Sequence, residues 1–139
     1  MKANWIVLLV LLVSAHSCKK EERAEKQIKS QITGQWELEY YSCVECIIPP
    51  TAYPQGNGNI IEFAKDGRFI RKLKDSITFN GHYNIVTNKE CNKSGNLSLQ
   101  TNETANGSVR FITIENSKLQ LSTPSCYADG ATSIYRRIE

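Results

Sequence analysis

The sequence predicts an all-β domain, an up-and-down antiparallel β-barrel of about eight strands, behind an export signal and a charged linker. Short segments that alternate apolar and polar residues follow one another along most of the chain, as strands with one buried face require. Turn-forming pairs such as Asp66-Gly67 and Asn116-Ser117 separate them. Beyond residue 30 no segment keeps a 3.6-residue period, and strands in simple succession favour a barrel over a sandwich.

The chain starts with the features of a secretory signal. Met1-Lys2 is positively charged, and the apolar run from Trp5 to Val13 is too short to span a bilayer as a helix. Four residues, Ser-Ala-His-Ser, then lead to Cys18. We therefore expect residues 1–17 to be a signal peptide. The small residues before Cys18 also suit ordinary signal-peptidase cleavage, which is the alternative.

The residues around Cys18 resemble a bacterial lipobox, in which the cysteine receives a diacylglyceryl group and becomes the mature N-terminus. Ala15 stands where lipoboxes usually carry leucine. Ser-Cys-Lys-Lys followed by acidic residues looks like the start of small lipoproteins of some Gram-negative bacteria. The resemblance implies lipidation at Cys18 and an outer-membrane lipoprotein, on the periplasmic face or at the cell surface.

Residues 18–32 are expected to form a charged tether between the lipid and the domain. Lys19 to Ser30 holds five Lys/Arg and three Glu, a net charge of +2, and has little apolar surface to bury. Such a segment is expected to be a solvated leash without packed structure. Residues 31–139 carry equal numbers of basic and acidic residues, which argues against nucleic acid as a partner.

The predicted barrel domain, residues 33–139, begins with the clearest strand of the chain. Trp36, Leu38 and Tyr40 alternate with polar residues, which predicts that these three side chains share a buried face. The segment from Ser42 to Asn59 contains Pro-Pro and Gly-Asn-Gly sequences and is predicted to be a long loop.

The remaining strands follow from alternation and turn chemistry. Asp66-Gly67 predicts a tight hairpin between strands at residues 60–64 and 68–73, because glycine readily adopts positive φ. From Ile77 to Ile85 the apolar phase continues across Gly81, which indicates one strand bent at this glycine. Four further strands are expected at residues 96–100, 109–115, 118–122 and 132–138.

Several short motifs follow one another along the whole domain. In chain order they are Gly34-x-Trp36, Phe63-x-x-Asp66-Gly67-x-Phe69, Gly81-x-Tyr83-x-Ile85, Leu119-x-Leu121, and Asp129-Gly130 with Tyr135-x-Arg137. Their order and spacing resemble a family of small lipocalin-like lipoproteins. The resemblance implies a lipocalin-like barrel whose closed end is plugged by Trp36. It also implies that an arginine of the last strand lies over the indole, in a contact worth about 0.5–2 kcal/mol. Arg137 is the candidate, with Arg136 as the alternative.

Four cysteines, Cys43, Cys46, Cys91 and Cys126, lie in the exported domain, and their even number indicates up to two disulfides. In an eight-strand meander the loops after alternate strands share one end. This predicts that Cys43 or Cys46 meets Cys126, whereas Cys91 belongs to the other end. A metal site at Cys43-x-x-Cys46 lacks a second close pair or a useful histidine, so we expect no metal and no cofactor.

Side chains on the predicted inner face are candidates to line a ligand cavity. They are Tyr40, Phe63, Phe69, Arg71, Phe79, Tyr83, Phe111 and Tyr135. Arg71 shares the face of Phe69, and no acidic residue stands at an inward position, so a ligand anion or water is the expected partner of this guanidinium. The alternative is that a bulge turns Arg71 outward and that the aromatic rings simply fill the barrel.

The residue inventory predicts a non-enzymatic, monomeric protein held at a membrane by its lipid. His82, the histidine left after signal cleavage, is expected on the polar side of a strand, where no catalytic set can form around it. The first functional hypothesis is a barrel that binds a small hydrophobic or amphipathic ligand. The second is an interaction module of the cell envelope with a filled barrel, whose loop at Ile47-Ile48-Pro49-Pro50 contacts protein or glycan.

Overall fold

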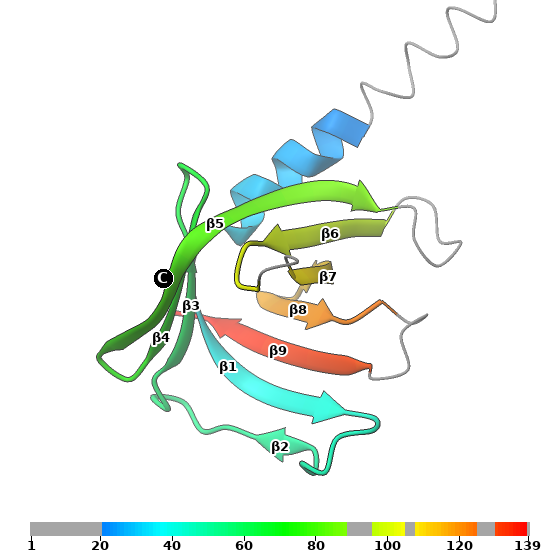
Figure 1. Ribbon diagram of the computed structural model, residues 1–139. Helices are drawn as coiled ribbons and strands as arrows, with labels where there is room; N and C mark the ends of the chain where they lie inside the picture. The colour runs from blue at the N-terminus through cyan, green and yellow to red at the C-terminus, as the bar shows by residue number, and fades with distance from the viewer. Residues whose placement is uncertain (1–20, 89–95, 105–107, 125–129, 139) are drawn as a thin grey trace, which may run out of the picture.

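The computed structural model describes residues 21–88, 96–104, 108–124 and 130–138 (Figure 1). Its strands form one antiparallel meander with the order β2-β1-β3-β4-β5-β6-β7-β8-β9, closed into a barrel by pairing of β1 with β9. The strands are β1 (Gly34–Cys43), β2 (Thr51–Ala52), β3 (Asn59–Phe63), β4 (Arg68–Leu73), β5 (Ser76–Asn88), β6 (Asn96–Thr101), β7 (Ser108–Glu115), β8 (Lys118–Ser122) and β9 (Ala131–Arg137). The predicted fold class is confirmed, with the short β2 added inside the predicted long loop.

The predicted turn chemistry is confirmed in the hairpins. Gly67 has φ of 90°, a conformation that glycine adopts without strain, and closes the β3–β4 hairpin. Strand β5 runs unbroken through Gly81, where a Cβ atom would lie 2.2 Å from the Asn102 side-chain oxygen. A side chain does not fit at this bend, so Gly81 is needed for close packing rather than for a turn.

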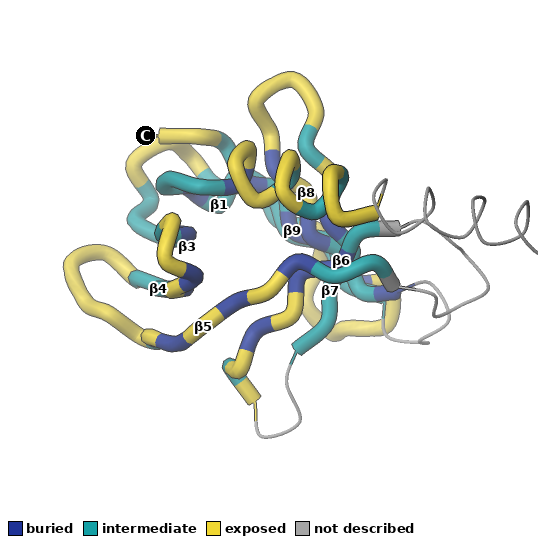
Figure 2. Tube along the Cα trace, turned by 90° about the horizontal axis from the view of Figure 1, so that it is seen from above, coloured by how far each residue is buried: buried dark blue, intermediate teal, exposed yellow. Residues whose placement is uncertain are grey.

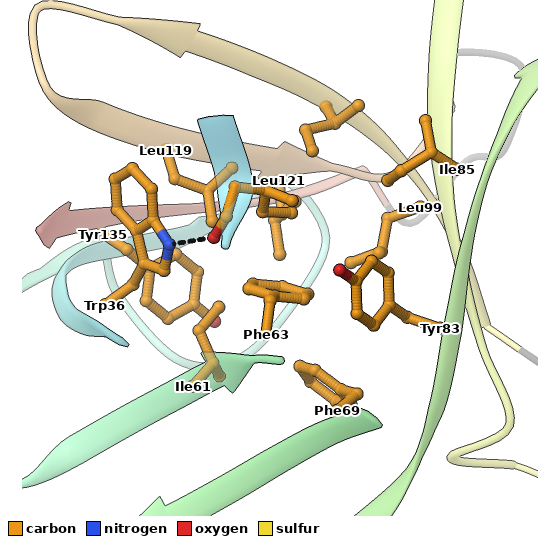
Figure 3. Packing of buried hydrophobic residues seen from close by; sticks show 12 residues of the cluster. Trp36, Ile61, Phe63, Phe69, Tyr83, Ile85, Leu99, Leu119, Leu121 and Tyr135 are labelled. Atoms are coloured by element: carbon orange, nitrogen blue, oxygen red, sulfur yellow. Dashed lines mark hydrogen bonds between the residues drawn. The ribbon is translucent and has the colours of Figure 1, made fainter. Parts of the chain in front are cut away.

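Alternation of buried and exposed residues along the strands places one contiguous core inside the barrel. Figure 2 shows this alternation along β5, where Gly81, Tyr83 and Ile85 are buried and the residues between them are exposed. The core side chains converge on the interior (Figure 3) and are Ile32, Trp36, Ile61, Phe63, Phe69, Tyr83, Ile85, Leu99, Ile112, Leu119, Leu121 and Tyr135.

The segment predicted to be a solvated leash is helical over residues 21–32, so that prediction is wrong. The helix lies across β5 (Figure 1), where the Glu25 carboxylate accepts hydrogen bonds from the Thr87 amide at 3.0 Å and hydroxyl at 3.1 Å. Ile28 and Ile32, one turn apart, pack on the core, and Ile32 is fully buried. Two apolar residues at helical spacing thus anchor an otherwise polar segment. None of the helices within the described ranges is long and apolar enough to cross a membrane.

Trp36 and Arg137 meet at the end of the barrel beneath this helix, as the resemblance implied. The Arg137 guanidinium lies 4.4 Å from the centre of the buried indole. The indole Nε1 donates a hydrogen bond of 2.7 Å to the Ile32 carbonyl, and Arg137 donates to the carbonyls of Gln31 and Thr33. Both side chains therefore cap the helix C-terminus, whose last carbonyls have no partner within the helix.

The loop that follows β1 is fixed to the outside of the barrel by the carboxylate of Glu37. Glu37 points outward, as predicted, yet only 3% of its surface is exposed. It accepts hydrogen bonds from the amides of Gly56 at 3.0 Å and Gly58 at 3.2 Å, and Arg136 Nε lies 3.7 Å away. The alternative arginine, Arg136, thus interacts with Glu37 beneath this loop, whereas Arg137 lies over the indole.

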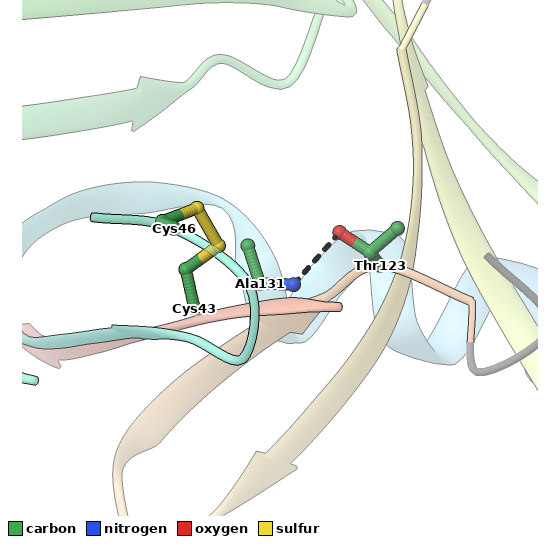
Figure 4. Close-up of a disulfide and its surroundings, with 4 residues drawn as sticks. All are labelled: Cys43, Cys46, Thr123 and Ala131. Carbon is green, nitrogen blue, oxygen red and sulfur yellow. Dashed lines mark hydrogen bonds between the residues drawn. A yellow bond between two sulfur atoms is a disulfide. The ribbon is translucent and has the colours of Figure 1, made fainter. Parts of the chain in front are cut away.

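Cys43 and Cys46 form a disulfide with each other at the end of β1 (Figure 4). The prediction that either of them pairs with Cys126 is therefore wrong. The chain turns sharply after β1 and brings the two Cα atoms within 5.3 Å, a separation that a disulfide spans without moving the backbone. Cys18, Cys91 and Cys126 lie outside the described residues.

Candidate ligand-binding cavity

A cavity of about 200 Å³ opens into the barrel where β1 and β3 diverge. The two strands pair from Gly34 to Glu37, and beyond this point β1 continues along β9 and β2 instead. The residues that line the cavity are Leu38, Tyr41, Asn59, Ile60, Ile61, Arg71, Lys72, Arg110, Ser133 and Tyr135. The wall is therefore partly apolar and partly cationic.

A bulge in β1 decides which tyrosine reaches this cavity. The register between β1 and β9 shifts between Leu38 and Tyr40, so the inward face passes from Leu38 to Tyr41. Tyr41 lines the cavity, whereas Tyr40 pairs with Ala52 of the outer strand β2. The prediction that Tyr40 lines the cavity is therefore wrong, because strict alternation does not hold across a bulge.

Arg71 points inward, as the phase of β4 predicts, and borders the cavity. It stands opposite the buried Ile61 in the sheet register. Its guanidinium is held by Glu103, with Nη1 to Oε1 at 2.7 Å and Nη2 to Oε2 at 3.0 Å. The expected ligand or water partner is thus replaced by a protein carboxylate. Glu103 lies beyond the end of β6, outside the strand pattern that the sequence analysis used to assign faces.

Arg110 is a second arginine of the cavity wall that the sequence analysis missed. It stands opposite the buried Leu99 in the sheet, and it lies two residues before the buried Ile112, on the same face of β7. The signal that could have revealed it is this period-2 spacing along β7, which sets Arg110, Ile112 and Ile114 on one face. Phe111, between them, belongs to the other face, opposite Ser98 and Ser122. Phe111 lines neither the cavity nor the core cluster, so its assignment to the cavity is wrong.

Tyr135 forms the floor of the cavity and is nearly fully buried. Burial, the largest effect, raises the pKa of its phenol, and the positive charge of Arg71 opposes this shift. The hydroxyl therefore remains protonated at neutral pH and can donate a hydrogen bond into the cavity.

The predicted aromatic set divides between the cavity and the core. Phe63 lies 5.2 Å from Phe69 and 5.1 Å from Tyr83 between ring centres, and Phe79 packs on Phe69 at 5.9 Å. Phe63, Phe79 and Tyr83 face the barrel interior, as predicted, but they pack in or against the core and do not line this cavity. Close contact among the rings fills the closed half of the barrel, which leaves the open half to Tyr135 and its neighbours.

A smaller recess of about 20 Å³ lies next to the cavity and shares Ile61, Arg71, Arg110 and Tyr135 with it. Thr101 also lines the recess, and its buried hydroxyl makes no hydrogen bond within the described part of the chain. A buried hydroxyl without a partner is costly, and the recess has room for about one water molecule or one ligand oxygen.

His82 and the cysteine pair stand apart from the cavity. His82 is exposed on β5, and its amide donates to the Asn102 side chain at 2.8 Å. In the described ranges no three His, Cys, Asp or Glu side chains converge as metal ligands would. Comparison of the chain with known protein families, curated proteins and solved structures finds no match.

Proposed function

We propose that this protein is a membrane-anchored, lipocalin-like protein whose barrel binds a small hydrophobic or amphipathic molecule. The observation that carries the proposal is the cavity of about 200 Å³ lined by residues of β1, β3, β4, β7 and β9. An apolar cavity of roughly 150 Å³ already accommodates benzene. The volume therefore fits a single ring or a short alkyl segment, with any longer part of the ligand extending through the opening.

The mixed chemistry of the wall supports an amphipathic ligand. Leu38, Ile61 and the ring of Tyr135 offer apolar contact, whereas Ser133 and Arg110 offer hydrogen bonds. Apolar surface supplies most of the contact in small-molecule sites, and a few polar groups fix the orientation of the ligand. The cavity wall, as far as the structure describes it, includes no histidine or cysteine, which supports binding without covalent chemistry.

The proposed cellular location rests on the N-terminal sequence. Cys18 follows an apolar run of signal-peptide length and resembles a lipidated cysteine, so we place the protein at the outer membrane as a lipoprotein. We propose that the protein attaches to the membrane through the lipid on Cys18. Because the pairing of β1 with β9 closes the sheet, the barrel can act as a monomer.

The test is calorimetric titration of the mature chain, residues 18–139, carrying Cys18→Ser so that no detergent is needed, with 1-octanol and octanoate. We expect saturable binding by at least one probe. Leu38→Trp enlarges a side chain of the cavity wall and should weaken binding about tenfold or more, since an overfilled site excludes its ligand. The matched control is Leu73→Trp at an exposed position of β4, which should bind as the parent does.

A second candidate function is an interaction module of the cell envelope. The disulfide holds a loop in which Val44, Ile47 and Ile48 are 84%, 102% and 56% exposed. Three exposed aliphatic side chains on one constrained loop are typical of a contact patch. Failure of both probes to bind, together with native mass spectrometry that finds no retained ligand, would overturn the binding proposal and favour this alternative.

A further inference from the structure

Three cationic side chains line the cavity, and two of them are neutralised by the protein. Arg71 is held by both oxygens of Glu103. Lys72 Nζ lies 2.8 Å from Glu62 Oε2. Arg110, the third, makes no ion pair or hydrogen bond within the residues that the structure describes. The cavity therefore carries one uncompensated positive charge, on a guanidinium whose five donors suit a carboxylate.

Arg110 lies where its positive charge faces the cavity inside the barrel. The residue is half-buried, stands opposite the buried Leu99, and lines both the cavity and the recess. Tyr135 shares both spaces, and the hydroxyl of Thr101 is an unpartnered buried group of the recess wall. Arg110, Thr101 and Tyr135 thus line one recess, next to the ion pair of Arg71 with Glu103, and offer donors that the ion pair does not use.

We propose that Arg110 binds the carboxylate of the ligand, so that the protein selects small amphipathic acids over their neutral analogues. This inference rests on the proposed binding function and names its specificity-determining residue. Arg71 does not take this role, because Glu103 already occupies its bidentate face. The carboxylate lies between Arg110 and the Tyr135 hydroxyl, and the apolar part of the ligand packs against Leu38 and Ile61. The alternative is that Arg110 is solvated by water and contacts no ligand.

The experiment compares octanoate with 1-octanol, which have the same alkyl length and differ in charge, by titration of the mature protein, residues 18–139, carrying Cys18→Ser. Hydrogen bonds to charged groups discriminate by about ten- to a hundredfold, so octanoate should bind at least about tenfold more tightly. Arg110→Gln should abolish this ratio, because it weakens the binding of octanoate much more than the binding of 1-octanol. Arg110→Lys, which keeps the charge, should retain a preference for octanoate.

Two controls separate Arg110 from its neighbours. Lys72→Gln removes a paired cation of the same wall, and the double variant Arg71→Gln with Glu103→Gln removes one ion pair without changing the net charge. Both should keep the octanoate preference. An unchanged ratio in folded Arg110→Gln, or equal affinity of the parent for the two probes, would overturn the inference while the binding function stands. Absence of binding by either probe would overturn both.

Discussion

At the scale of the residue, several side chains act against the simple rule that polar residues of a strand face water. Glu37 lies on the outer face of β1, where alternation predicts exposure, and is nevertheless buried beneath the loop at residues 53–58. Its carboxylate satisfies two loop amides that would otherwise lack partners. Glu37 therefore fixes the path of the loop that leads into β3 and the cavity rim.

Glu37→Gln should destabilise the protein by about 1.5–3 kcal/mol, because it replaces charge-assisted hydrogen bonds to Gly56 and Gly58 with weaker ones. The matched control is Glu39→Gln on the same strand. Glu39 pairs with the half-exposed Lys118, and such surface pairs contribute about 0–1 kcal/mol. Urea unfolding of both variants measures the difference, and equal midpoints would contradict the assigned role of Glu37.

Residue-level prediction from sequence succeeded where the period of two was unbroken and failed at irregularities. The inward positions of Phe69, Arg71 and Tyr135 follow from phase alone. Tyr40 was misassigned because a bulge in β1 shifts the phase by one residue, and this bulge has no sequence signature in the alternating run. The partner of Arg71 was missed because Glu103 lies 32 residues away in a loop, where no local pattern indicates an orientation.

At the scale of the element, the helix at residues 21–32 shows why a charged segment can still belong to the fold. Isolated helices of about 12–15 residues are marginal in water, so its stability must come from packing. Ile28 and Ile32 supply that packing at a spacing of four residues, and Trp36 and Arg137 cap its last carbonyls. Composition alone does not reveal this, because half of the segment is charged and most of the rest is polar. The i, i+4 spacing of the two isoleucines was the available signal.

Ile32→Ala should destabilise the protein by about 2–5 kcal/mol, because it removes a fully buried side chain from the junction of helix and barrel. Ile77→Ala makes the same chemical change on β5 at a position that is 61% exposed. There we expect a loss within about 1 kcal/mol, the range of strand propensity. Thermal unfolding of the two variants provides the comparison. A shift as small for Ile32→Ala as for Ile77→Ala would mean that the helix does not pack on the core in solution.

At the scale of the whole molecule, closure of the sheet and capping by the helix leave the two ends of the barrel unequal. One end is filled by Trp36, Ile32 and aromatic rings in tilted and edge-to-face contact, and the other holds the cavity with its cationic wall. The number and order of the long strands could be predicted from the sequence, because each is a local pattern bounded by a turn. The cavity could not, since its shape depends on where β1 leaves β3 and on how side chains from five strands meet.

The docked helix also changes what lipidation at Cys18 would do. The described helix extends back to residue 21, so at most about 10 Å of extended chain separates it from the cysteine. A lipid on Cys18 would therefore hold the barrel close to the membrane surface instead of at the end of a long leash.

We expect the mature protein to sediment with membranes and Cys18→Ser to move it to the soluble fraction, because the substitution removes the thiol that would carry the lipid. Cys43→Ser, combined with Cys46→Ser so that no thiol is left unpaired, is the matched control. These changes also remove sulfur atoms from the exported domain but leave the lipidation site intact, so this variant should remain with the membranes. Recovery of the unsubstituted protein in the soluble fraction would refute the anchor and, with it, the proposed outer-membrane location.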